Sequence, residues 1–188
     1  MADAILTLNA GSSSIKFALF ERGAGDIAEQ PRLRGQIDGL GAQPHLEAGD
    51  ASGRALADID LSLAGAAPHR EALSFLLGWL DQHSGGRRIG GVGHRVVHGG
   101  EKYARPVRLD PVSIDLLRDL VPLAPLHQPH NLAGIEAMAA ALPGVPQVAC
   151  FDTAFHRGQP EVAQRFALPR RITEDGVRRY GFHGLSYE

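Results

Sequence analysis

Apolar and polar residues alternate with a period of two in two short runs near the start of the chain. The runs span residues 4–8 and 15–20, and in the second the apolar residues hold positions 15, 17 and 19. Such alternation is typical of strands with one buried face. The connection between them reads NAGSSS, which is rich in turn formers. We therefore predict a β-hairpin here, and further strands over residues 32–38 and 55–61.

Apolar residues recur at helical spacing farther along the chain, for example the leucines at positions 73, 76, 77 and 80. In order, this part predicts a helix over 68–82 with Pro68 in its first turn, a strand over 89–98, a helix capped by Asp110, a helix over 131–142, a strand over 145–151 and a loop over 170–176. Strands come first and then alternate with helices. We therefore predict an α/β fold with a mixed sheet and helices on its faces.

The last residues, 180–188, have the pattern of a loop that enters a helix. Ser186 is the predicted cap, and Glu188 is a favourable residue for a first turn. A domain rarely ends one turn into an element, so we expect the chain to be part of a longer protein. The alternative is that these residues simply fray.

Composition narrows the class of protein. Of the 188 residues, 44% are apolar and 21% are charged, and the net charge is -2, as in an ordinary globular domain. The chain has no excess of basic residues that would predict binding to nucleic acid, and no basic stripe that would predict binding to a membrane surface. The apolar runs are too short for a signal peptide or a membrane span. The single cysteine, Cys150, fits a cytoplasmic location.

The hairpin sequence NAGSSSIK is the first stretch with chemical potential. Gly11 allows close approach of the backbone to a ligand, Ser12 and Ser14 offer hydroxyl groups, and Lys16 adds a positive charge. It is not a Walker motif, because no GxxxxGK[ST] occurs. Two interpretations remain open, a contact with phosphate and an ordinary polar hairpin.

The second stretch is GGVGHRVVHGG, residues 90–100. His94 and His98 are four residues apart, which would suggest a zinc pair on a helix, but the valines and glycines favour a strand. On a strand the two histidines share one face and Arg95 lies on the other. An arginine on a buried strand needs an anion, which is either a ligand or a carboxylate of the protein.

Three loops add further candidates. His127 lies in the proline-rich APLHQPHN, and is either a ligand contact or a histidine packed on the core. Asp152 follows a predicted strand; it could orient a substrate, hold a cation through water or cap the next turn. His183 stands between glycines in YGFHG, where it could donate a hydrogen bond to an anion.

Five motifs in this order closely resemble the acetate kinase family. They are LNAGSSSIKFALF, GHRVVHGGEKY, APLHQPHNLAGIEA, FDTAFH and RRYGFHG, and they extend from residue 8 to residue 184. The resemblance implies reversible transfer of the terminal phosphoryl group of ATP to acetate, with Mg²⁺. It also implies a homodimer whose subunit has two RNase H-like domains around a cleft, as in sugar kinases, Hsp70 and actin. Residues 1–188 would then be the N-terminal, acyl-binding domain, and the nucleotide-binding domain would lie outside this chain.

The resemblance also implies roles on the phosphate side of the site. Asn9 would lie near the magnesium and the path of the phosphoryl group. Ser12, Ser14 and Lys16 would belong to the loop on the phosphate side. His183 would donate a hydrogen bond to the phosphoryl group during transfer.

On the acid side, the resemblance implies that Arg95 contacts both acetate and the phosphoryl group. Val97 and Leu126 would line the pocket for the methyl group, with His127 in a supporting role. Asp152 would orient the arginine and the metal region. These roles fit the chemistry: acetate is already ionised at neutral pH, so the difficulty is to bring one anion onto another.

The chain departs from the family pattern after FHG, where Leu185-Ser186-Tyr187 replaces the common Thr-Ser-His. We expect a repacked helix start there. A second active-site arginine, the adenosine-binding segments, a magnesium carboxylate and a pocket proline of the family have no counterpart within 188 residues. Two alternatives therefore remain: a kinase for propionate or butyrate, and a module that binds anions without catalysis. By itself, the 188-residue chain is expected to be inactive.

Overall fold

The structure is a computed structural model that describes residues 4–23, 25–63, 65 and 67–187. Its strands are β1 Ala4–Ala10, β2 Ile15–Glu21, β3 Leu33–Asp38, β4 His45–Asp50, β5 Ala55–Asp60, β6 Ile89–Val96, β7 Val107–Arg108 and β8 Gln147–Phe151. Its α-helices are α1 Pro68–His83, α2 Pro111–Asp119, α3 Gln128–Ala141, α4 Glu161–Gln164 and α5 Arg170–Glu174. Single 3₁₀ turns are η1 Val121–Leu123, η2 Phe155–Gly158 and η3 Gly184–Ser186.

The strands form one mixed sheet in the order β5-β4-β3-β2-β1-β6-β8-β7. Strands β1 to β5 pair antiparallel in sequence, whereas β6 and β8 run parallel to β1 on its other side. This arrangement confirms the predicted α/β class with a mixed sheet. The carboxyl ends of β1, β6 and β8 consequently meet at one edge, the place where α/β sheets bind ligands.

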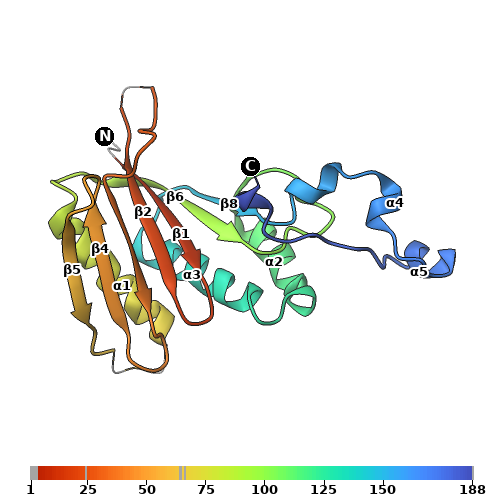
Figure 1. The fold of residues 1–188 in the computed structure, drawn as a ribbon, viewed down its shortest axis with the longest axis horizontal. Helices are drawn as coiled ribbons and strands as arrows, with labels where there is room; N and C mark the ends of the chain where they lie inside the picture. The colour runs from red at the N-terminus through yellow and green to blue at the C-terminus, as the bar shows by residue number, and fades with distance from the viewer. Residues whose placement is uncertain (1–3, 24, 64, 66, 188) are drawn as a thin grey trace.

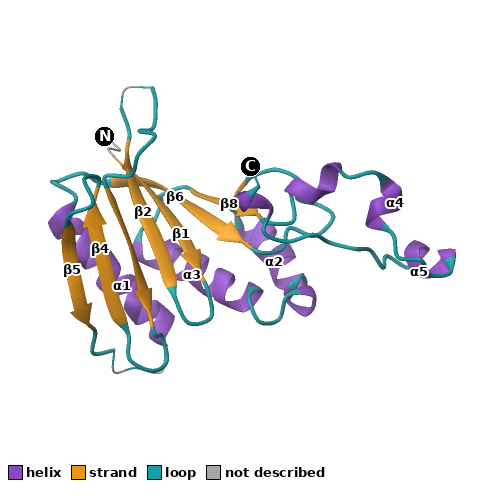
Figure 2. Cartoon of the chain, viewed as in Figure 1, coloured by secondary structure: helices purple, strands orange, loops and turns teal. Residues whose placement is uncertain are grey.

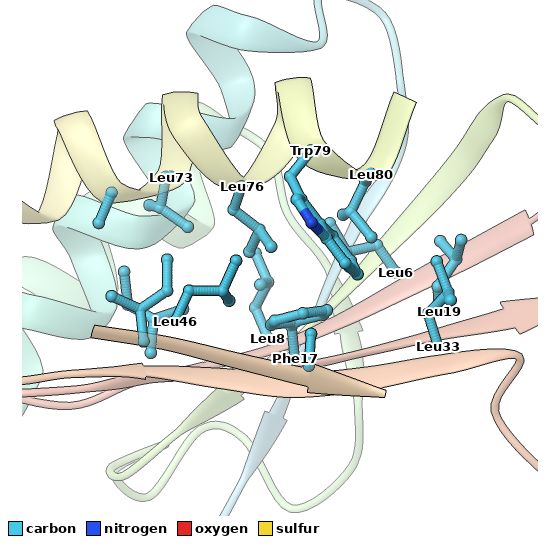
Figure 3. Close-up of a cluster of buried hydrophobic side chains, with 14 of the residues drawn as sticks. Leu6, Leu8, Phe17, Leu19, Leu33, Leu46, Leu73, Leu76, Trp79 and Leu80 are labelled. Carbon is cyan, nitrogen blue, oxygen red and sulfur yellow. The ribbon is translucent and has the colours of Figure 1, made fainter. Parts of the chain in front are cut away.

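One face of the sheet is buried under α1 and α3 (Figures 1 and 2). The alternation predicted for β2 puts Phe17 and Leu19 on this face, where Phe17 meets the edge of Trp79 with ring centroids 6.0 Å apart (Figure 3). On the opposite face, the side chains of Thr7 and Lys16 are exposed. A second buried cluster lies below the carboxyl ends of the parallel strands and includes Phe151. Packing thus fixes the strands whose ends carry the candidate residues.

Residues 159–180 leave the sheet as an arm that carries α4 and α5 (Figure 1). The arm exposes several apolar side chains, namely Val162, Phe166, Leu168 and Val177. From its far end the chain returns to the sheet, and η3 lies beside β8. Residues before and after the arm therefore contribute to the same edge of the sheet.

Several boundaries differ from the predictions. Residues 170–174, predicted as loop, form α5, and α3 begins three residues early, because Pro129 suits a first turn. The sequence did not predict β4 and β7. Ser186 is inside η3 and caps no helix, so that prediction is wrong, while Glu188 lies outside the described residues. Within the described part of the chain, no helix is long and apolar enough to cross a membrane.

Candidate active site

Arg95 and Asp152 form an ion pair at the carboxyl edge of the sheet. The Nε and Nη2 groups of Arg95 donate to both carboxylate oxygens of Asp152, at 2.8–3.2 Å. The two residues end neighbouring parallel strands, since Arg95 pairs with Cys150 and the N–H of Asp152 donates to the carbonyl of Val96. Hydrogen bonding to Asp152 raises the pKa of Arg95, which is a cation at every physiological pH.

The pair answers the question that the sequence left open for both residues. Asp152 is 1% exposed, and both of its carboxylate oxygens accept hydrogen bonds from the guanidinium instead of capping the next turn. The Arg95 side chain keeps 30% of its surface exposed. The carboxylate thus holds the arginine in place, while part of the Arg95 side chain stays accessible to solvent.

His183 approaches the same arginine from the end of the arm. Its Nδ1 lies 3.2 Å from Nη2 of Arg95. Because arginine has no acceptor, Nδ1 must accept, and the proton of the neutral imidazole is then on Nε2. That N–H group remains available as a donor, the role predicted for His183.

The backbone at His183 is left-handed, with φ of 60°, the one such non-glycine residue among those described. Its neighbours impose this conformation. The N–H of Gly184 donates to the carbonyl of Asp152 at 2.9 Å, and a Cβ at Gly184 would lie 2.2 Å from that oxygen. His156 bonds to the carbonyl of Phe182 at 2.9 Å. Strain held by so many contacts is common at functional sites.

A cavity of about 370 Å³ lies beside these groups, which is large enough for a small ligand. It brings together six of the ten residues predicted for the site: Asn9, Arg95, Val97, His127, Asp152 and His183. Val97 adds an apolar surface next to the cation of Arg95. A cation beside an apolar wall is the arrangement that a short carboxylate with an alkyl tail would need.

The other four predicted residues do not line this cavity. Leu126 is 74% exposed on a turn. Its neighbours in sequence Leu123 and Ala124 line the cavity instead and give it an apolar surface. Ser12 and Ser14 lie in the β1–β2 hairpin, where the N–H of Gly11 donates to the carbonyl of Ser14 at 2.8 Å. The roles of these residues stay predictions.

Lys16 lies on the exposed face of the sheet, opposite Asn9 in the β1–β2 ladder. It lines a neighbouring hollow that it shares with Asn9 and Arg95. Its role too stays a prediction.

The two histidines of GHRVVHG have different surroundings. His94 is buried against the amide of Gln147, 2.6 Å away, and burial lowers its pKa to about 4. β6 ends before His98, whose ring packs edge-on against Tyr180. Burial lowers the pKa of His98 as well. Among the described residues, no group of three or more histidine, cysteine or acidic side chains could hold a metal ion.

Sequence reasoning missed several residues of the cavity, above all Asn131 and Phe182. Asn131 had a detectable signal. It stands in line with Ile135 and Met138, both buried, so a polar residue occupies a core-facing position of the helix. A buried amide at such a position needs hydrogen-bond partners, so the pattern predicts a polar contact there.

Comparison with known proteins identifies a family that the chain resembles over nearly its whole length. Residues 4–188 match the model of the Acetokinase family. Acetate kinase of Rhodopseudomonas palustris (strain CGA009) is 50% identical over 188 residues, and that of Rhizobium meliloti is 48% identical over 186. The alignments cover 100% and 99% of this chain but 47% of each relative. The chain therefore spans about half the length of these relatives.

Solved structures show the same fold. The crystal structure of Porphyromonas gingivalis acetate kinase matches 99% of this chain and 46% of its own, with a TM-score of 0.83 and 39% identity. A propionate kinase from Francisella tularensis matches 100% of this chain and 46% of its own, with a TM-score of 0.82 and 31% identity. The match of the family model over nearly every residue shows that the chain belongs to the acetokinase family.

Proposed function

We propose that this chain is the acyl-binding, N-terminal domain of an acetate kinase, which transfers a phosphoryl group reversibly from ATP to acetate. One observation carries the proposal: a buried carboxylate, Asp152, fixes Arg95 at the wall of a cavity that also presents Val97 and His183. Membership of the acetokinase family and the names of the relatives support it.

The geometry suits a reaction between two anions. A carboxylate oxygen of acetate bonds to the terminal phosphorus of ATP while the bond to the β,γ-bridging oxygen breaks, which gives acetyl phosphate and ADP. No strong base is required, because acetate is already ionised. Arg95 offsets negative charge between the reactants, and the Nε2–H group of His183 donates to the phosphoryl oxygens. Val97 contacts the methyl group.

Mg²⁺ and the nucleotide belong to the same proposal. The described residues offer few oxygen ligands near the cavity, because Arg95 occupies both oxygens of Asp152. This donor set fits an ion that keeps water and nucleotide oxygens as most of its ligands, with Asn9 as the residue of this chain beside it. When bound, the ion would offset charge on the phosphates. Ser12, Ser14 and Lys16 would face the phosphate side.

Three further points are proposed from the family alone. The nucleotide would bind mainly to a second domain, the complete protein would be a homodimer, and it would act in the cytoplasm. Propionate remains a competing substrate, because the Francisella tularensis structure that matches the chain is of a propionate kinase.

The test is formation of acyl phosphate from Mg-ATP and acetate, propionate or butyrate, trapped as the hydroxamate. Two proteins would be compared: the 188-residue chain, and a hybrid protein in which it is joined to the second half of R. palustris acetate kinase. The complete R. palustris enzyme serves as the positive control. We expect activity in the hybrid protein only, highest with acetate.

Other results would change the conclusion. A higher rate with propionate or butyrate would identify a different acyl kinase. An inactive hybrid protein beside an active control would contradict catalysis and leave a domain that only binds anions. Turnover by the 188-residue chain alone would contradict the proposed place of the nucleotide.

A further inference from the structure

Two neighbouring strands of the sheet, β1 and β6, separate at the edge of the cavity. β1 pairs with β6 only as far as Leu8 and His94. Beyond that point β1 continues with β2 up to Ala10, whereas β6 continues with β8 up to Val96. Backbone groups that face the gap between β1 and β6 have no partner on the opposite strand, so another group must satisfy them.

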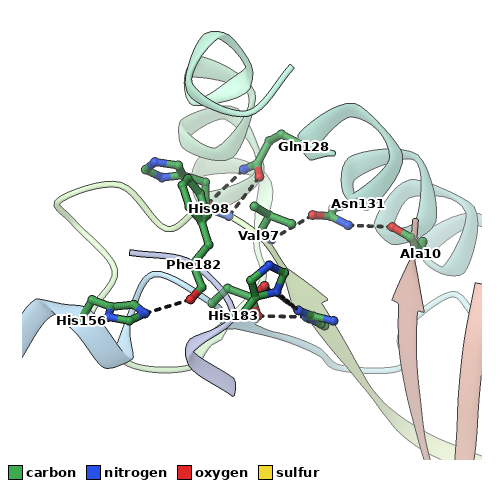
Figure 4. A network of polar contacts seen from close by, with 10 residues as sticks. Ala10, Val97, His98, Gln128, Asn131, His156, Phe182 and His183 are labelled. Carbon is green, nitrogen blue, oxygen red and sulfur yellow. Dashed lines mark hydrogen bonds and ion pairs between the residues drawn. The ribbon is translucent and has the colours of Figure 1, made fainter. Parts of the chain in front are cut away.

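The side-chain amide of Asn131 spans this gap. Its Oδ1 accepts a hydrogen bond from the N–H of Val97 at 2.9 Å, and its Nδ2 donates to the carbonyl of Ala10 at 2.8 Å (Figure 4). Asn131 is 4% exposed and extends from the first turn of α3. One rigid planar group therefore joins the β1 side of the gap to the β6 side.

Both joined residues belong to the cavity wall. Ala10 follows Asn9 on β1, and Val97 follows the strand that carries Arg95. A change in the distance between Ala10 and Val97 would move the phosphate side of the cavity relative to the acid side. Misplacement by about 1 Å can reduce an enzyme's rate about 100-fold.

We propose that Asn131 is a positioning residue that sets the width of the cavity and thereby its preference for acetate over longer acids. The inference rests on the proposed function. Both polar atoms of the Asn131 side chain bond to the backbone of the cavity wall, so the role that we assign to this residue is to hold the two sides of the cavity at a fixed separation. An apolar pocket distinguishes acids that differ by one methylene by roughly 10-fold or more, so a small change in width should be measurable.

The same helix offers a matched control. Gln128 is a second amide in the first turn of α3, is 0% exposed and bonds to the backbone of His98 and Leu117. It makes no hydrogen bond to β1 and does not line the cavity. Gln128→Ala and Asn131→Ala each remove a buried amide with backbone partners, so their effects on stability should be comparable. Only Asn131→Ala removes the link across the gap.

The experiment measures kcat/KM of the hybrid protein for acetate, propionate and butyrate, together with Tm, in Asn131→Ala, Asn131→Asp and Gln128→Ala. Asp at position 131 keeps an acceptor for the N–H of Val97 but places a second oxygen against the carbonyl of Ala10. We expect both Asn131 variants to lose about 10-fold or more in kcat/KM for acetate. The ratio of kcat/KM for acetate to kcat/KM for butyrate should fall by roughly 5-fold or more in these two variants. Gln128→Ala should lower Tm but keep the ratio of the unsubstituted hybrid protein.

The inference is overturned if the acid ratio of the Asn131 variants stays unchanged while their Tm falls as in Gln128→Ala. It is also overturned if Gln128→Ala shifts the ratio as strongly as Asn131→Ala. If Asn131→Ala does not fold, the ratio in Asn131→Asp decides. An unsubstituted hybrid protein that fails beside an active R. palustris control would instead refute the proposed function, and the inference with it.

Discussion

Removal of Arg95 should damage stability and catalysis by separable routes. Arg95→Ala leaves Asp152, 1% exposed, as a buried carboxylate without its partner. Breaking one side of a buried pair costs about 3–5 kcal/mol. The lower end, about 3 kcal/mol, applies here because the arginine itself is 30% exposed and water reaches the pair. In a chain of this size that corresponds to a decrease in Tm of about 6–12 °C.

The double variant Arg95→Ala with Asp152→Ala separates the two effects. It removes the uncompensated carboxylate, so we expect it to recover about 2 kcal/mol relative to Arg95→Ala. It does not restore the cation. Turnover in the hybrid protein should therefore stay reduced, by about 10²–10³-fold or more, in both the single and the double variant.

Thermal unfolding of the 188-residue chain at low concentration measures the first quantity, and hydroxamate trapping with the hybrid protein measures the second. Arg118→Ala is the control, because Arg118 also pairs with carboxylates, Asp115 and Glu136, but is 51% exposed. It should change stability by no more than about 1 kcal/mol. Near-normal turnover in Arg95→Ala would remove Arg95 from the mechanism, and a double variant less stable than Arg95→Ala would refute the buried pair.

Three further predictions concern pH, positioning and association. Burial lowers the pKa of His94 to about 4, against an ordinary value of 6.5, so on acidification His94 is protonated in the unfolded chain before it is protonated in the folded chain. The free energy of unfolding should therefore be unchanged above pH 6.5. It should fall by up to about 1.4 kcal/mol per pH unit as the pH drops toward 4. Urea unfolding across this range would show that dependence, and an equal slope in His94→Gln would contradict it. His156→Leu removes the hydrogen bond that holds the backbone before His183, and should lower kcat by about 10-fold or more. His156→Gln keeps a hydrogen-bond donor and should recover part of the lost kcat. Equal rates in both variants would show that this hydrogen bond has no effect on kcat. The 188-residue chain exposes Val162 and Phe166 on its arm and should associate at high concentration; a monodisperse monomer by light scattering would count against this.

The sequence predicted those elements whose burial follows a simple period. β1, β2 and α1 each bury one face, so their apolar residues recur every second position or at helical spacing. β4 buries only Leu46 and Ala48 and contains charged residues, which leaves little pattern to detect. β7 is two residues long and exists through its pairing with β8. Such elements depend on the neighbouring strand, which a single sequence does not reveal.

The same distinction applies to the site. Local composition identified Arg95, Asp152 and His183 as candidates, but it could not join residues that are 57 and 88 positions apart. Arg95, Asp152 and His183 come together because β6 pairs in parallel with β8 and because the chain returns from the arm to the sheet. Asn131 was missed for a related reason, because its two partners, Ala10 on β1 and Val97 just after β6, are far from it in the sequence and meet it only in the fold.

The charges of the cavity are consistent with the second domain that we propose from the family. Phosphoryl transfer to acetate brings several negative charges together, and such reactions depend on cations and donors fixed around the moving group. Here the positive charge of Arg95 is largely compensated by Asp152, and His183 contributes a donor rather than a full charge while Arg95 occupies its Nδ1. On the proposed function, these residues would orient the acid and the phosphoryl group more than neutralise them. Additional positive charge would then come from Lys16, from the metal ion and from residues of a second domain. We therefore expect the hybrid protein, and not the 188-residue chain, to turn over.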